Sequence, residues 1–159
     1  MYAKKQCVVI KYTNDTRYDA ECVTTHDKVS ESAINATSLS DVDDEKTKLA
    51  DVIAVDEGQF FPDLVDFCEA WANQGKVVLV AALDSTFERK PFGNVLALVP
   101  LAEKIDKLSA VCKCGKDAAF SKRMNKDTTL EVIGGTEMYR ATCRGCFYDP
   151  LPSSEPLKD

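Results

Sequence analysis

The feature that most constrains the fold is an apolar strand, a segment of helical period and a second apolar strand that follow one another directly. Residues 51–55 read DVIAV and residues 76–82 read KVVLVAA, two short β-branched runs typical of buried strands. Between them, residues 63–74 carry apolar side chains at the spacing of one helix face: Leu64, Phe67, Cys68 and Trp71. Asp63 is placed to cap this helix and Gly75 to end it. The alternation predicts an α/β fold with a parallel sheet.

The rest of the core divides into weaker segments. Residues 6–12, QCVVIKY, predict a further buried strand, and residues 22–26 indicate a possible short one. Residues 28–44 are rich in Ser, Asp, Asn and Thr, so we expect loop or weak helix there. A short helix is expected over residues 94–103 and a fourth strand over residues 107–111.

The domain organisation follows from a change of character at Cys112. From there to Tyr148 the segments are short, β-like and interrupted by Cys and Gly. We therefore expect an incomplete α/β core over residues 1–108 and a small metal-stapled module over residues 109–148. Residues 149–159 are rich in proline and are expected to form a disordered tail.

The overall charge limits the kinds of partner. The 159 residues carry a formal net charge of −6. This argues against a broad nucleic-acid or anionic-membrane surface, since both need clustered Lys and Arg. No run approaches the roughly 20 apolar residues that span a bilayer, and the first apolar run is too short for a signal peptide. We therefore expect a cytoplasmic protein that binds neither nucleic acid nor membrane.

Two carboxylates directly follow the central strand. In open α/β sheets, ligands bind beyond the carboxyl ends of the strands. The run DVIAVDEG places Asp56 and Glu57 at such an end, before a glycine, Gly58, that permits a sharp turn. An Asp here suits a magnesium–water shell, and a neighbouring Glu can take a proton from an attacking hydroxyl. From position alone, the more common interpretation is that the two carboxylates end a strand and cap the next element.

Longer strings resemble a known family. These strings are DEGQFFPDLVDFCEA, VAALDSTFERKPFG, EVIGG ahead of paired cysteines, DTRY at residues 15–18 and KLSAVC at residues 107–112. Together they resemble the cellular-type (type II) thymidine kinases, nearly collinearly over residues 6–147. The resemblance implies a P-loop, RecA-like parallel sheet, followed by a small zinc-ribbon-like β module with a substrate-binding lasso loop.

The resemblance also implies an activity and the residues that perform it. The family transfers a phosphoryl group from ATP, with Mg²⁺, to the 5′-hydroxyl of thymidine or deoxyuridine in pyrimidine salvage, and its members are homotetramers. Carried over by motif, Glu57 would be the general base and Asp56 would help hold Mg²⁺. Asp15 and Arg17, from DTRY, would lie beside the metal and the transferred phosphate. A forked guanidinium suits that role, although a surface ion pair is the commoner fate of an arginine in a polar loop.

The same resemblance implies a pocket for the base. A lasso over residues 129–139 would offer main-chain groups to the pyrimidine edge, with Tyr139 stacked on the ring and Phe60 as the opposite wall. The full set of implied substrate contacts is Phe60, Leu83, Phe87, Phe92, Ser121, Leu130, Val132, Gly134 and Tyr139. Ser121 stands where the family commonly has Thr, which removes a methyl group beside the thymine. Without the resemblance, most of these aromatic residues would be assigned to the core.

Four cysteines form two close pairs near the end of the chain. Cys143 and Cys146 have the C-x₂-C spacing of a zinc knuckle, whereas Cys112 and Cys114 form a tighter C-x-C pair. The resemblance assigns all four as ligands of a structural Zn²⁺. The C-x-C pair departs from the family's usual spacing and cannot adopt the same knuckle. Two interpretations therefore stay open: a four-thiolate zinc site, and a slack site with weak or absent metal.

One string that this chemistry needs does not occur. The ATP phosphates are cradled by G-x-x-x-x-G-K-[ST], and no part of the sequence matches it. We expect that a strand, this loop and a helix, about 25–40 residues by ordinary element lengths, are missing upstream. An incomplete gene model, an alternative transcript or a deliberate deletion would each account for an N-terminally truncated chain. Three hypotheses therefore stand: a thymidine kinase, a catalytically inactive chain that binds nucleoside or co-assembles with kinase subunits, and an unstable product without function.

Overall fold

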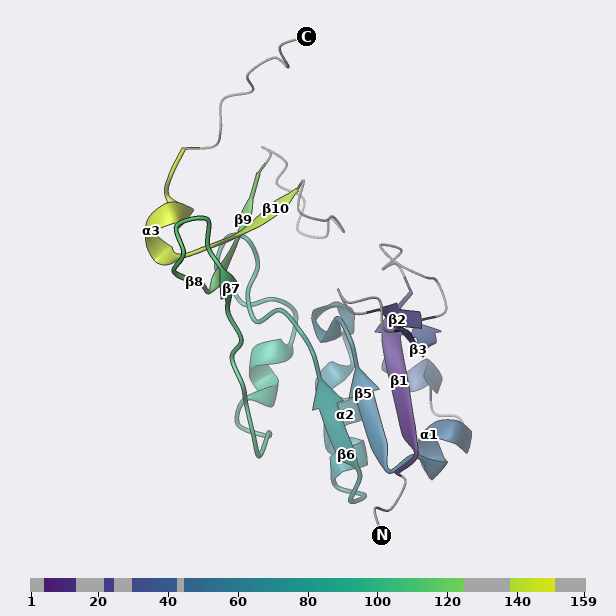
Figure 1. Ribbon diagram of the computed structural model, residues 1–159. Coiled ribbons are helices and arrows are strands. Elements are labelled where there is room, and N and C mark those ends of the chain that lie inside the picture. Colours follow the sequence, from purple (N-terminus) through teal and green to yellow (C-terminus); the bar gives the residue numbers. More distant parts are fainter. Residues whose placement is uncertain (1–4, 14–21, 25–29, 43–44, 125–137, 151–159) are drawn as a thin grey trace. The chain divides into compact units, whose positions relative to one another are not determined.

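A computed structural model describes the chain at residues 5–13, 22–24, 30–42, 45–124 and 138–150. The chain forms two compact units (Figure 1). The first unit comprises residues 1–84 and 91–105, and the second comprises residues 85–90 and 106–159. The hexapeptide at residues 85–90 thus belongs to the second unit, although the segments before and after it belong to the first.

A four-stranded parallel sheet forms the centre of the first unit. The order of its strands is β4 (Ile34–Ala36), β1 (Cys7–Tyr12), β5 (Val52–Val55) and β6 (Val77–Val80). The strands predicted over residues 6–12, 51–55 and 76–82 are confirmed, and so is their parallel arrangement. Strand β5 lies between β1 and β6, which places its carboxyl end well inside the sheet (Figure 1).

The prediction of loop or weak helix over residues 28–44 is wrong in part. This stretch contains β3 (Ser30–Ser32), which pairs with β2 (Cys22–Thr24), then β4 and the 3-10 helix η1 (Leu39–Val42). Each element has three or four residues, too few for a hydrophobic period to be visible in the sequence. Strand β4 is recognisable only from its pairing with β1. The short helix α1 (Glu45–Leu49) follows and was likewise not predicted.

Helix α2 (Leu64–Ala72) packs on one face of the sheet, as its helical period predicts (Figure 1). Its buried residues are the four apolar residues named above: Leu64, Phe67, Cys68 and Trp71. They join one core with Ile10 of β1 and with Ile53 and Val55 of β5. Gly75 has a φ of 83°, a left-handed conformation that glycine adopts readily, and lies just after the helix, before β6 begins.

The start of α2 differs from the prediction. The Asp63 side chain makes no hydrogen bond to its own helix. Its carboxylate instead accepts hydrogen bonds from Ser38 Oγ at 2.6 Å, from Leu39 N at 3.1 Å and from Ser40 N at 2.9 Å. Asp63 therefore satisfies the first amides of η1 and joins that helix to the start of α2.

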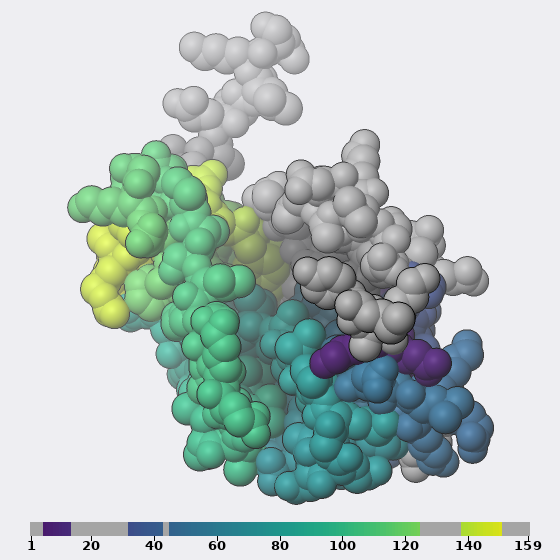
Figure 2. Space-filling view, turned by 60° about the horizontal axis from the view of Figure 1, so that its bottom comes forward, coloured from purple at the N-terminus to yellow at the C-terminus, as the bar shows by residue number. Residues whose placement is uncertain are grey.

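Strand β6 lies at the edge of the sheet. Val78 and Val80 pack against the core, while Val77 and Leu79 are 42% and 56% exposed. In the space-filling view, the teal atoms of this part of the chain reach the surface (Figure 2). Parallel sheets usually have both faces covered, and the unpaired backbone groups of an edge strand can pair with another chain. With two exposed apolar side chains in addition, β6 is suited to association with another chain.

The helix predicted over residues 94–103 is the single 3-10 turn η3 (Val95–Leu98), preceded by Asn94, which donates a hydrogen bond to the Pro62 carbonyl oxygen. No helix in the described parts of the chain is long and apolar enough to cross a lipid bilayer.

Two antiparallel strand pairs and a helical turn build the second unit. Strand β7 (Ala110–Val111) pairs with β8 (Asp117–Ala118), and β9 (Phe120–Arg123) pairs with β10 (Tyr139–Thr142). The helix α3 (Arg144–Phe147) follows β10. The fourth strand predicted over residues 107–111 is shorter than expected and belongs to the β7–β8 hairpin, outside the parallel sheet.

Candidate active site and metal centre

The acidic pair lies at the carboxyl end of the central strand β5, as the sequence predicts. The backbone N–H of Asp56 donates to the Ile10 carbonyl oxygen at 2.8 Å, which extends the ladder between β5 and β1 by one residue. Glu57 then leaves the strand with φ 54° and ψ 41° and precedes the 3-10 turn η2 (Gly58–Phe60). A left-handed conformation is costly for a non-glycine residue, about 1–2 kcal/mol, and such residues cluster at functional sites.

The glycine of the motif has a different role from the one predicted. The sharp turn occurs at Glu57, whereas Gly58 does not adopt a positive φ. A Cβ on Gly58 would lie 2.8 Å from Val80 Cγ1. Gly58 is therefore required because β6 packs closely against the backbone of the motif.

Gln59 orients the Glu57 carboxylate. The Gln59 side chain is buried, with 4% exposure. Its Nε2 donates a short hydrogen bond to Glu57 Oε2, and its Oε1 accepts one from the Leu83 backbone N–H at 3.0 Å. Gly93 lies close to the backbone of Gln59: a Cβ on Gly93 would be 2.3 Å from the Gln59 carbonyl oxygen. No role for Gln59 was predicted, because the position of a buried amide between an acid and a loop becomes visible only in three dimensions.

Three aromatic rings lie beside the acidic motif in the first unit. The rings of Phe60 and Tyr12 stack at 4.9 Å between centroids, and those of Phe60 and Phe92 meet edge to face at 5.4 Å. Phe60 and Phe92 were both predicted to line the base pocket, and the structure brings them together. Tyr12, at the end of β1, was not predicted. Leu83, the remaining predicted contact in this unit, is 47% exposed.

The second unit holds three further predicted contacts. Phe87 lies in the hexapeptide, Ser121 on β9 and Tyr139 on β10, and all three side chains are half-buried. Arg123, which the sequence analysis did not select, contacts two of them: its guanidinium carbon lies 4.0 Å from the centroid of the Phe87 ring and 5.1 Å from that of Tyr139. The remaining predicted residues fall outside the described residues: Asp15, Arg17, Leu130, Val132 and Gly134.

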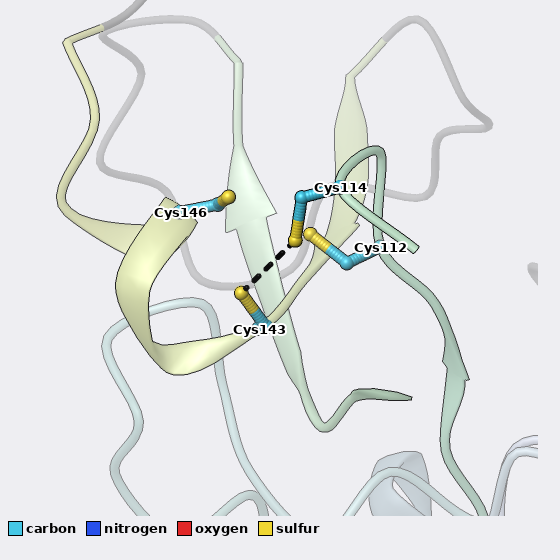
Figure 3. Close-up of side chains that lie close together, drawn as sticks. All are labelled: Cys112, Cys114, Cys143 and Cys146. Carbon is cyan, nitrogen blue, oxygen red and sulfur yellow. Dashed lines mark hydrogen bonds between the residues drawn. The ribbon is translucent and has the colours of Figure 1, made fainter. Parts of the chain in front are cut away.

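All four paired cysteines converge in the second unit (Figure 3). The sulfur atoms of Cys112, Cys114, Cys143 and Cys146 all lie within 4.8 Å of one another. The Sγ atoms of Cys114 and Cys143 are 3.6 Å apart. Thiolates around a tetrahedral Zn²⁺ at about 2.3 Å would lie about 3.8 Å from one another. The donor set and its spacing therefore fit a tetrahedral metal ion.

A tight turn brings the C-x-C pair into this cluster. The Gly115 backbone N–H donates to the Cys112 carbonyl oxygen at 2.8 Å, and Gly115 has a φ of 81°. Hydrogen bonds from the backbone N–H groups of Cys114 and Cys143 lower the pKa of the Cys112 thiol to about 6. The Cys146 backbone N–H likewise lowers the pKa of Cys143. In both pairs, the amide of the second cysteine thus stabilises the thiolate of the first.

The pKa of the Cys146 thiol shifts in the opposite direction. Hydrogen bonds to the sulfurs of Cys114 and Cys143 raise the pKa of Cys146 to about 12, because each favours its protonated form. Four sulfur atoms this close cannot all carry a negative charge without a positive ion between them. A bound metal supplies that charge and deprotonates its ligands outright.

Comparisons with known proteins agree with this arrangement. The family model described as "Thymidine kinase" matches residues 1–147. The thymidine kinases of vaccinia virus (strain Western Reserve) and of variola virus (isolate Human/India/Ind3/1967) are each 55% identical to this chain over 148 residues. The monkeypox virus thymidine kinase is 53% identical over the same length, and each alignment covers 92% of this chain and 82% of the relative. The acidic motif at the end of β5, the four-cysteine cluster and these matches lead to one conclusion: the chain belongs to the thymidine kinase family.

Proposed function

We propose that this chain carries the nucleoside-binding and proton-accepting part of a site that transfers a phosphoryl group from ATP to the 5′-hydroxyl of thymidine or deoxyuridine. The observation that carries the proposal is Glu57. It stands in a strained conformation at the carboxyl end of β5, with its carboxylate held by the buried amide of Gln59. Both the strained backbone of Glu57 and the fixed position of its carboxylate support a chemical role for this carboxylate.

The acidic residues divide the chemistry between them. Glu57 accepts the proton of the 5′-hydroxyl as that oxygen attacks the terminal phosphorus of ATP, so the oxygen attacks as a better nucleophile. Asp56, together with Asp15, would hold Mg²⁺, which when bound neutralises charge on the phosphate oxygens. Arg17 would add a fixed positive charge beside the transferred group.

The base-binding residues come from three places in the sequence. Phe60, Leu83 and Phe92 of the first unit would contact the nucleoside, and Phe60 and Phe92 already support each other through ring contact. Phe87, Ser121 and Tyr139 would contact it from the second unit. The lasso residues would offer main-chain groups to the pyrimidine edge: Leu130, Val132 and Gly134.

The cysteine cluster is proposed as a structural zinc site. The sulfur spacing supports it, and all four positions are protein thiols, which leaves no open position for a substrate. We further propose a RecA-like class for the parallel sheet, a homotetrameric assembly and a role in pyrimidine salvage in the cytoplasm. None of the six cysteines whose side chains the structure describes is in a disulfide, which is compatible with a reducing compartment.

A second function is favoured by one observation. The edge strand β6 exposes Val77 and Leu79, a surface suited to another chain, and the 159 residues contain no G-x-x-x-x-G-K-[ST] string. The chain would then bind nucleoside without turnover, or join kinase subunits. Comparing its mass in solution alone and mixed with a kinase subunit tests co-assembly, and two unchanged masses would exclude it.

Two measurements on the purified chain separate these functions. Calorimetry with thymidine is expected to show binding, while ATP- and Mg²⁺-dependent phosphorylation of labelled thymidine is expected to stay at background. Positioning of the phosphates supplies much of the catalysis in phosphoryl transfer. Absence of thymidine binding would contradict the proposal, and rapid turnover would contradict the need for a separate phosphate cradle.

The role of Glu57 has its own test, in a form extended by a G-x-x-x-x-G-K-[ST] segment. Glu57→Gln is expected to lower kcat by about 10²–10⁴-fold, the usual contribution of a general base, with thymidine affinity retained. Retention of most of the turnover would remove Glu57 from that role. Glu88→Gln is the matched control, because the Glu88 carboxylate forms an exposed ion pair with Lys90.

A further inference from the structure

Arg123 lies on strand β9 of the second unit, beside Phe87 and Tyr139, two of the proposed nucleoside contacts. Strands β9 and β10 lie side by side (Figure 1). In their ladder, Arg123 is directly opposite Tyr139, and Ser121 is opposite Ala141. Alternate residues of a strand share a face, so Ser121, Arg123 and Tyr139 lie on the same side of the hairpin. Arg123 is nevertheless only 5% exposed, and a buried guanidinium requires specific partners.

Among its partners are two aromatic residues proposed to contact the base. The guanidinium carbon of Arg123 lies 4.0 Å from the centroid of the Phe87 ring and 5.1 Å from that of the Tyr139 ring. Its Nη2 atom also donates a hydrogen bond to the Tyr139 hydroxyl oxygen. A planar cation that contacts two rings and bonds one of them at its hydroxyl restricts how both rings can rotate. One side chain therefore fixes residues that are far apart in the sequence.

We propose that Arg123 is a positioning residue for pyrimidine nucleosides, which holds Phe87 and Tyr139 in the orientation that receives the base. The inference rests on the proposed function for the contacts of those two rings with the ligand. Its physical content is preorganisation: rings that are already fixed lose less freedom when the nucleoside binds. A lysine cannot replace this arginine, because a compact ammonium neither stacks as a plane nor reaches both rings at once.

The same unit offers a matched control in Arg89. Its guanidinium lies 4.6 Å from the ring centroid of Phe147 and 5.0 Å from that of Tyr148, and it donates a hydrogen bond to the Tyr148 hydroxyl. Arg89 thus makes the same kind of contact with a different set of rings, those of Phe120, Phe147 and Tyr148. A general effect of losing a stacked arginine would appear in both variants, and a nucleoside-specific effect only at Arg123.

The first experiment is calorimetric titration of the 159-residue chain with thymidine. Arg123→Lys is expected to weaken binding about tenfold or more, the size of one lost stacked, hydrogen-bonded contact, while Arg89→Lys changes the affinity less than about threefold. Tyr139→Phe keeps the ring and removes only the hydroxyl acceptor, so an intermediate loss is expected. Equal losses in Arg123→Lys and Arg89→Lys, or no loss in Arg123→Lys, would overturn the inference.

A second measurement tests the hold on the rings without any ligand. In aromatic carbon–proton NMR spectra, the Phe87 and Tyr139 ring signals are expected to move toward unstructured values in Arg123→Lys and to stay in place in Arg89→Lys. Ring signals that do not move in Arg123→Lys would overturn the positioning role. Failure of the unmodified chain to bind thymidine contradicts the proposed function instead, and the ring signals still decide what Arg123 does.

Discussion

The two units are stabilised by different means. Among the described residues, the first has one core of twelve buried apolar residues, drawn from β1, β4, β5, η1, α2 and the segments between them. In the described part of the second unit, the buried core is Cys112, Ala118 and Cys143, with Ala141 and Cys146 packed against it. A large buried side chain contributes roughly 1.5–3 kcal/mol, and the described part of the first unit contains many of these. In the described part of the second unit, the contacts are instead those of the cysteine cluster and of arginines with aromatic rings.

The largest effect that would break this contrast is loss of the proposed zinc ion. Chelation, or Cys143→Ser, is expected to unfold the second unit and leave the first intact, because zinc contributes apparent free energies of about 10–16 kcal/mol to small zinc-folded peptides. Hydrogen exchange followed by mass spectrometry reads the two units separately. Cys7→Ser is the control, since Cys7 is exposed and outside the cluster.

Two outcomes would contradict this prediction. One is a second unit whose amides stay protected after chelation; the other is a first unit that loses protection together with it. The first would mean that the C-x-C pair leaves the site slack, the alternative that the sequence keeps open. Metal content measured before and after chelation decides whether zinc was present.

The same contrast explains how much the sequence could predict. Three sheet strands and α2 were predicted because their apolar residues recur at the period of the element that buries them, as in the Leu64–Trp71 face. β4 was missed because three residues have no visible period and depend on their neighbour β1. In the second unit, the four cysteines could be recognised by spacing, whereas the short strands around them carry little pattern of their own.

The candidate site shows the same division. Asp56 and Glu57 were found because they follow an apolar strand, and Phe60 because its motif resembles a family. Gln59 and Arg123 were missed because they are polar residues, and the sequence alone does not show that their side chains are buried. Their roles depend on contacts with residues 24 and 16 positions away.

The next largest effect is expected from filling the close contact between Gly93 and the backbone of Gln59, beside the acidic motif. Gly93→Ala would place a Cβ 2.3 Å from the Gln59 carbonyl oxygen, at a φ of 52°. The expected loss in the free energy of unfolding of the first unit is about 2–4 kcal/mol, from overpacking and strain together. Urea denaturation monitored at Trp71 in α2 measures it.

Gly75→Ala is the matched control for that measurement. Gly75 also has a positive φ, 83°, but a Cβ there would meet nothing within 4 Å. Its expected loss is about 1–2 kcal/mol, the cost of the left-handed conformation alone. Equal losses in the two variants would show that the close approach of Gly93 to Gln59 has no energetic consequence.

The smallest effect concerns the hydrogen bonds that the Asp63 carboxylate makes within the first unit. Partial burial raises the pKa of this carboxyl, but the hydrogen bonds from Ser38, Leu39 and Ser40 outweigh burial and hold the pKa below its usual value of 3.8. Because the folded pKa is depressed, the stabilisation is fully present above about pH 4. It is lost as the pH falls through the folded pKa.

Asp63→Ala is expected to cost about 1–2 kcal/mol at neutral pH, the size of a lost cap. Asp63→Asn keeps one acceptor oxygen but cannot ionise, so it should cost less. The difference in the free energy of unfolding between the Asp63→Asn variant and the unmodified chain is expected to shrink as the pH falls below about 4. Urea denaturation at pH 7 and at pH 3 measures both variants. A difference that stays constant across this range would mean that the charge of Asp63 contributes nothing to the stability of the first unit.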